Sequence, residues 1–185
     1  RLRLLLVLTA ADIRAVGPNV WNAWKAGLLR DLYEAAEDRL TGGLSHGGRE
    51  VRIEHAKNEM REFLVDLPAE AVEAHIARGY PSYWLSFDVD IHAWHARIAY
   101  EARFRSEPLT IKSRVDTFKA VTELTIYAMD HPGLFSRIAG AMAISGAHIV
   151  DAKIFTTTDG MALDTFWIQD DNGGAYDRAD KLARL

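Results

Sequence analysis

The strongest constraint on the fold lies in residues 121–169, where the hydrophobic period changes from two to about 3.6 and back. In residues 121–129, apolar side chains recur at every second position and so share one face, which predicts a strand. Residues 134–145 carry apolar side chains at steps of three and four, which predicts an amphipathic helix. Two further segments rich in β-branched and aromatic residues flank Asp159-Gly160, a strong hairpin signal. The expected order is strand, helix, strand, hairpin and strand.

The turn between the first strand and the helix offers an arrangement suited to a small ligand. Pro132 and Gly133 interrupt the strand and open the helix. The helix start presents backbone N–H groups and the positive end of the helix dipole beside the carboxylate of Asp130. This combination suits a zwitterion, because the N–H groups can take an α-carboxylate and Asp130 an α-ammonium. From spacing alone, an ordinary strand-to-helix turn is the favoured interpretation.

Resemblance to a known module adds weight to the binding interpretation. The strings D-H-P-G-L-F at residues 130–135, R-I-A-G-A in the helix and I-V-D-A at residues 149–152 resemble an ACT domain. This small βαββαβ module senses amino acids, and its strands commonly pair across a dimer or tandem interface that closes the ligand site. The resemblance implies these ligand-binding residues: Asp130, His131, Gly133, Leu134 and Phe135, with Ile149 and Val150 on the next strand.

Two longer strings resemble one enzyme family in particular. Residues 130–170 are similar to the first ACT domain of the bifunctional uridylyltransferase/uridylyl-removing enzymes, which modify the PII nitrogen-signalling protein. Residues 8–33 are similar to the same family just after its HD hydrolase core. The implied fold class is α+β. Residues 1–107 would be helical, the tail of an HD domain plus connector helices, and residues 108–185 an extended linker strand and an incomplete ferredoxin-like ACT domain lacking its last strand.

The resemblance also implies a function for the chain. It would be the regulatory part of a larger enzyme, in which glutamine bound to the ACT domain shifts the balance between uridylyl transfer to PII and its hydrolytic removal. It further implies Mg²⁺ or another divalent ion for the parent's chemistry, a cytoplasmic location, and ACT–ACT pairing within or between chains. Neither the nucleotidyltransferase signature nor the upstream His and Asp set of the HD site occurs here. We therefore expect no catalytic residues in this chain.

Two other readings remain open. The first is a non-catalytic ACT-type dimerisation or interaction module that binds no small molecule. The second is a different ACT-bearing enzyme of amino-acid metabolism, against which the string at residues 8–33 argues. Calorimetry with a panel of amino acids separates sensing from simple interaction.

The rest of the chain reads as helical. Helices are expected at residues 2–13, 49–67, 69–78 and 88–105, with another beginning after Asn19. The first is apolar almost all round, which predicts a central place in a helical packing. The glycines of residues 41–48 predict a loop, and Trp21 and Trp24 are expected to pack rather than to stack on a ligand. Residues 109–115 predict an extended segment that either adds to the sheet edge or ties the sheet to the helices. The missing last strand of an ACT sheet would cover apolar surface and pair with a neighbouring strand, so we expect a partner to take its place.

Composition excludes several classes of function. The chain of 185 residues carries 22 Lys and Arg against 26 Asp and Glu, a net charge of −4, and no charge run approaches a nucleic-acid footprint. With no Cys there are no disulfides or thiolate metal sites, which fits a reducing cytosol. The apolar start, residues 1–11, is too short to span a bilayer and is read as a buried helix.

Asp12 is a candidate metal ligand by resemblance alone. It stands where the family places the last carboxylate of the HD metal site, whose other ligands lie upstream. Hydrolysis at a metal needs several convergent ligands, so we expect no metal bound to this chain itself. The alternative is a helix-terminal Asp that pairs with Arg14 or a backbone N–H.

The histidines give a second metal candidate. His92 lies four residues after Asp88 and three before His95, so these side chains share one helix face, with Asp90 close by in the sequence. This spacing can bind zinc but is more typical of a polar helix face. His148 stands where the ACT pattern usually reads Asn, which puts a direct glutamine contact there in doubt. We expect three further histidines to be exposed to solvent: His46, His55 and His75.

Overall fold

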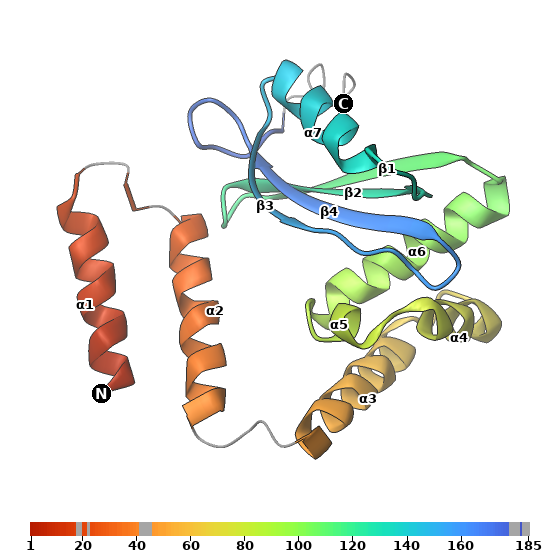
Figure 1. The fold of residues 1–185 in the computed structure, drawn as a ribbon, viewed down its shortest axis with the longest axis horizontal. Helices are drawn as coiled ribbons and strands as arrows, with labels where there is room; N and C mark the ends of the chain where they lie inside the picture. Colours follow the sequence, from red (N-terminus) through yellow and green to blue (C-terminus); the bar gives the residue numbers. More distant parts are fainter. Residues whose placement is uncertain (18–19, 22, 41–45, 178–181, 183–185) are drawn as a thin grey trace.

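The computed structural model describes residues 1–17, 20–21, 23–40, 46–177 and 182, and they form an α+β fold (Figure 1). Its helices are α1 (Leu2–Ala15), α2 (Ala23–Leu40), α3 (His46–Phe63), α4 (Ala69–Arg78), α5 (Pro81–Trp84), α6 (Val89–Arg105) and α7 (Leu134–Ile144). Its strands are β1 (Leu109–Asp116), β2 (Val121–Met129), β3 (His148–Lys153) and β4 (Met161–Gln169). The expected helical half followed by a sheet is thus confirmed as the fold class.

The four strands form one antiparallel sheet in the order β1-β2-β4-β3. The central strands β2 and β4 are buried along nearly their whole length. Such continuous burial means that both faces of the sheet are covered, unlike a sheet with one solvated face.

Helices cover the two faces unequally (Figure 1). Helices α3 to α6 form one core, to which the sheet contributes Tyr127 and Leu163. Helix α7 covers the other face and shares a second core with Leu124, Ile126 and Phe166. Successive strand residues point to opposite faces, so each central strand contributes to both cores. The Asp130 turn therefore begins on the α7 side, opposite the helical half.

Strand β1 occupies the edge that a closing ACT strand would fill, so a strand of the chain itself lies there in place of the expected partner. It pairs with β2 from Leu109 opposite Ala128 to Asp116 opposite Val121. The link is a tight turn in which the Lys119 amide donates to the Asp116 carboxylate at 2.9 Å. The extended segment thus joins the sheet, the first of the two placements expected for it.

The expectation that the first helix is centrally buried is wrong for this chain. No residue of α1 is buried, and Leu4, Leu5, Val7 and Leu8 are each at least 60% exposed. Its contacts are with α2, and the two helices lie to one side of the layered body (Figure 1). An apolar helix is buried only if enough partner surface surrounds it, and the described residues supply α2 alone.

The other helix predictions hold in outline. Helix α4 has the expected bounds, α6 begins one residue later than expected and α3 is shifted toward the N-terminus. The short helix α5, which packs Tyr83 and Trp84 into the core, was not predicted. The loop expected at residues 41–48 is described only from His46 on, where α3 already begins, so the expectation is wrong for residues 46–48. Residues 41–45 and the side chain of Trp24 lie outside the described residues. The boundary between residues 1–107 and 108–185 stays a prediction.

Candidate functional site

The turn from β2 to α7 has the conformation that its sequence demands. Gly133 caps the helix with φ of +86°, a left-handed value that a side chain rarely adopts. The Leu134 amide donates to the carbonyl of His131 at 3.1 Å, and the Asp130 amide donates to that of Gly160 at 3.0 Å. Pro132 lies just before the cap rather than inside the helix. A tight and locally specified loop therefore presents the start of α7.

This turn is open to solvent. Asp130, His131, Gly133 and Phe135 are exposed, and Leu134 is half-buried. Within the described part of the chain, the amides of Gly133, Phe135 and Ser136 donate to no backbone carbonyl. Unpaired N–H groups at a helix start commonly donate hydrogen bonds to a carboxylate or phosphate. The predicted turn residues thus lie together, with donors still available.

Two residues that sequence reasoning did not single out lie beside Asp130. The hydroxyl of Thr156 donates to Asp130 Oδ2 at 2.6 Å, across the loop between β3 and β4. Asp164, on β4 opposite Ile126, is 2% exposed and lies near enough for the Asp130 charge to oppose its ionisation. In the sequence A-L-D-T-F a charged residue stands within an apolar strand, and this pattern was the signal that could have identified Asp164. Contact with Thr156 had no local signal, because the residues are 26 apart.

Asp164 is the most unusual carboxyl group near the turn. Burial raises its pKa to about 6, and the nearby Asp130 adds to this, against a hydrogen bond from the Phe155 backbone. Its Oδ1 is fully buried and has no hydrogen-bond partner in the described structure. A buried carboxyl oxygen without a partner is costly, so this group is poised to gain from a proton or a cationic neighbour.

Ile149 and Val150 do not lie with the other predicted ligand residues. Ile149 pairs with Ile168, which is opposite Thr122 at the start of β2, whereas Asp130 follows the end of β2. Eight residue steps along the strand separate the two places, about 26 Å. Within one chain they cannot contact the same amino acid. His148 at that far end lies 2.7 Å from Asp171 Oδ1, away from the Asp130 turn.

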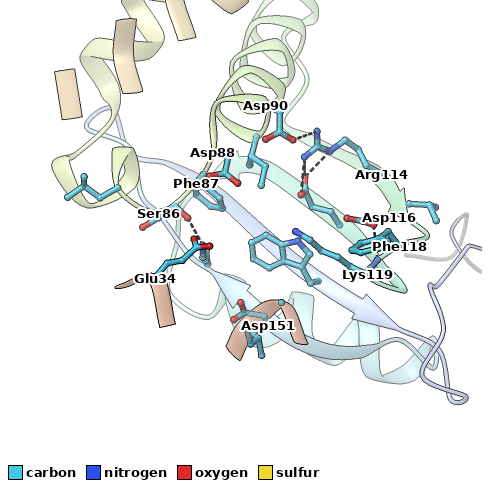
Figure 2. Close-up of a pocket in the computed structure, with 18 of the residues that line it drawn as sticks. Glu34, Ser86, Phe87, Asp88, Asp90, Arg114, Asp116, Phe118, Lys119 and Asp151 are labelled. Carbon is cyan, nitrogen blue, oxygen red and sulfur yellow. Dashed lines mark hydrogen bonds and ion pairs between the residues drawn. The ribbon is translucent and has the colours of Figure 1, made fainter. Parts of the chain in front are cut away.

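A cleft of about 940 Å³ lies on the opposite face of the sheet, between β1, β2, the start of α6 and α2 (Figure 2). Arg114 there binds Glu123 at 2.8 Å and Asp90 at 3.5 Å, with its guanidinium over the ring of Trp94. Lys153 donates to the Ser86 carbonyl and lies over aromatic rings. Because these cations already have protein partners, the cleft offers a ligand less than its size indicates.

The histidine predictions need correction. His75, His92 and His95 are all buried, not solvated and not a polar helix face. The Tyr83 hydroxyl lies 3.0 Å from His75 Nε2 and 3.2 Å from His95 Nδ1, and His95 Nε2 lies 2.9 Å from the Thr165 hydroxyl. This chain of hydrogen bonds joins the helical half to β4.

Burial sets the charge of these histidines. It lowers the pKa of His75 to about 3, with further lowering by Arg78, and it lowers the pKa values of His92 and His95 in the same direction. Neutral imidazoles in a hydrogen-bonded chain are structural groups here. His55, by contrast, is exposed as expected, 3.1 Å from Glu59, and the side chain of His46 is outside the described residues.

The candidate metal residues do not converge. Asp12 lies exposed on α1. Across the described ranges no three His, Asp or Glu side chains are grouped as a metal site would require. In the same residues, no helix combines the length and apolar character needed to cross a membrane.

Comparison with known proteins finds relatives that match the whole of this chain. No protein-family model matches it. It is 56% identical over 187 residues to the bifunctional uridylyltransferase/uridylyl-removing enzyme of Azospirillum brasilense, and 51% and 45% identical to the proteins of that name from Gluconobacter oxydans and Rhodospirillum rubrum. Each match covers 100% of this chain and 20% of the relative, so the chain spans about one fifth of those proteins. Over its whole length, the chain is therefore similar to a region of proteins named bifunctional uridylyltransferase/uridylyl-removing enzyme.

Proposed function

We propose that this chain is the amino-acid-sensing region of an enzyme that attaches uridylyl groups to the PII signalling protein and removes them. The names of its relatives support the two activities, which would be carried out by parts of the protein outside this chain. PII as the target and glutamine as the effector rest on the family resemblance. The ACT-like turn at Asp130 is the sensing site in this proposal.

The open turn is the observation that carries the proposal. Asp130 is exposed and carries a carboxylate, while the amides of Gly133, Phe135 and Ser136 have no backbone acceptor among the described residues. A free amino acid would place its α-carboxylate on these amides and its α-ammonium on Asp130. The exposed Phe135 and His131 would border its side chain.

Regulation follows from linkage between binding and conformation. An effector shifts an equilibrium only as far as its affinities for the two states differ. In the proposed mechanism, the bound amino acid stabilises one arrangement of the ACT-like sheet and so favours either uridylyl transfer or uridylyl removal. Cytoplasmic location, and Mg²⁺ or a similar ion at the catalytic centres, belong to the same proposal and rest on the resemblance. Asp12 would contribute to such a centre only together with ligands outside this chain.

Calorimetry of the whole protein with each of the twenty amino acids tests the sensing site. Saturable heat with glutamine and not with the other amino acids is expected. Asp130→Ala should weaken binding at least tenfold, because the α-ammonium of the bound amino acid loses its charge-assisted hydrogen bond to the carboxylate. Asp66→Ala, at an exposed carboxylate of the helical half, is the matched control and should bind like the unaltered protein. Equal affinity of Asp130→Ala and the unaltered protein would remove the site from this turn.

A second function is favoured by a separate observation. Strand β3 is an edge of the sheet, and near it Ile144 is 90% exposed and Ile149 37% exposed. An edge strand with apolar neighbours is a template for pairing with another strand. The chain could therefore serve as an ACT-type pairing module that binds no small molecule. Sedimentation of the chain, with Ile149→Lys as the disrupting variant, together with silence in calorimetry, would support this alternative.

A further inference from the structure

The tip of the β3–β4 hairpin, residues 156–160, contacts both the Asp130 turn and the helical half. On the turn side, the Thr156 hydroxyl donates to Asp130 Oδ2 at 2.6 Å. The Asp130 amide donates to the Gly160 carbonyl at 3.0 Å. The side chain and the main chain of Asp130 are thus both bonded to the hairpin tip.

On the helix side, the same tip is bonded to α4 and α6. The Thr158 amide donates to the Arg78 carbonyl at 3.0 Å, at the last residue of α4. The Asp159 carboxylate pairs with Arg103 of α6, and Arg78 Nη1 lies 3.9 Å away. Burial opposes ionisation of Asp159, but the Thr157 hydroxyl and the two arginines lower its pKa. Asp159 is therefore ionised at neutral pH and lies between an arginine of α4 and an arginine of α6.

The tip is tight enough to move as one piece. The Gly160 amide donates to the Thr157 carbonyl at 2.9 Å, and the Thr157 amide to the Met161 carbonyl at 2.8 Å. The Thr157 hydroxyl also donates to Asp159 Oδ1 at 2.6 Å. These bonds close the turn, so a short and fully hydrogen-bonded stretch joins Thr156 to Asp159, three residues away.

We propose that the hairpin tip couples occupancy of the Asp130 turn to helices α4 and α6. The inference rests on the proposed function, since it gives the route by which an amino acid at Asp130 acts. An ammonium group at Asp130 competes with the Thr156 hydroxyl for carboxylate lone pairs. Binding therefore changes the hydrogen bond between Thr156 and Asp130, and with it the ion pairs of Asp159 with Arg103 and Arg78. By reciprocity, weakening these ion pairs changes the affinity of the turn for its ligand.

The placement of the elements favours this route. The turn begins on the α7 face, and α4 and α6 lie on the other face of the sheet (Figure 1). The hairpin tip passes from one face to the other at the sheet end, with side-chain and backbone hydrogen bonds at each contact. Two bonded steps, Asp130 to Thr156 and Asp159 to Arg103, connect the two sides.

Hydrogen exchange measured by mass spectrometry on the whole protein, with and without saturating glutamine, tests the coupling. Glutamine should change exchange at least threefold in peptides from α4 and α6 as well as in the turn. Asp159→Asn should keep the change in the turn and lose it in the helices. Asp66→Asn is the matched control, because it breaks the Asp66–Arg97 pair at 2.8 Å within the helical half without touching the hairpin. It should keep both responses.

A ligand-free arm separates this inference from the proposed function. Thr156→Val removes the hydroxyl at nearly constant volume and should speed exchange in α4 and α6 at least threefold. In the Asp159→Asn background it should have no further effect, since the connection is already broken. If no amino acid binds the unaltered protein, the sensing proposal fails, and this arm still decides the coupling. Additive effects of the two substitutions, or a full helix response in Asp159→Asn, would overturn it.

Discussion

At the scale of single residues, Asp164 has the most consequential environment. Its pKa of about 6 in the folded chain exceeds the ordinary value near 3.9, so the folded state holds a proton that the unfolded chain has released. The sign follows from linkage: stability from this group is fully present below about pH 4 and is lost as the pH rises through about 6.

Asp164→Asn removes that contribution and serves as a test. The unfolding free energy of the variant relative to the unaltered chain should rise by about 1–3 kcal/mol between pH 4 and pH 7.5, because only the unaltered chain must ionise a buried group. Urea titrations at each pH measure the difference, in which the opposing effect of the buried histidines cancels. Asp12→Asn, an exposed control, should show no trend. A constant difference across the range would mean that Asp164 ionises freely.

Tyr83 is the second residue whose role can be measured. Its hydroxyl serves both His75 and His95, and all three side chains are buried. Tyr83→Phe should lower the unfolding free energy by about 2–4 kcal/mol, because two buried ring nitrogens lose their partner. Tyr100→Phe, on the outer side of α6, should change it by less than about 0.5 kcal/mol. Equal effects of the two variants would show that the hydrogen bonds contribute nothing net.

At the scale of elements, the junction of α4 and α5 depends on close packing. A Cβ added to Gly79 would lie 2.8 Å from Nε1 of Trp84, whose indole donates to the Gly79 carbonyl at 3.2 Å and is 2% exposed. The rigid buried ring cannot move aside cheaply, so Gly79→Ala should destabilise the chain by about 1–3 kcal/mol.

Gly140 provides the matched opposite case. It lies in α7 with no atom within 4 Å of an added Cβ. Gly140→Ala should stabilise the chain by about 0.5–1 kcal/mol through helix propensity. Thermal unfolding of both variants compares the two signs, and a stabilising Gly79→Ala would refute the packing at the α4–α5 junction.

At the scale of the whole molecule, stability is expected to be uneven. Strands β2 and β4 are buried on both faces, whereas α1 has no buried residue. Regions with little burial open locally at low free energy, so amides of α1 should exchange on the order of 10²-fold faster than those of β4. Hydrogen exchange of the 185-residue chain measures this directly. Equal protection of α1 and β4 would show that α1 folds as part of the same cooperative unit.

The amino-acid pattern by itself determined the local elements and the turn. The periods of residues 121–169 predicted β2, α7, β3 and β4 in order, because alternation and helical steps act between neighbours in the chain. Pro132 and Gly133 identified the open start of α7 for the same local reason. Family-like strings added the enzyme family, which the relatives bear out.

Only the tertiary structure decided which groups meet. Burial of His92 and His95 depends on what packs against α6, and helical spacing carries no information about the partner. The contact of Asp130 with Thr156, and its separation of about 26 Å along the strand direction from Ile149, follow from strand register. Register is set by pairing between distant segments, where the free energy of burial outweighs local preference.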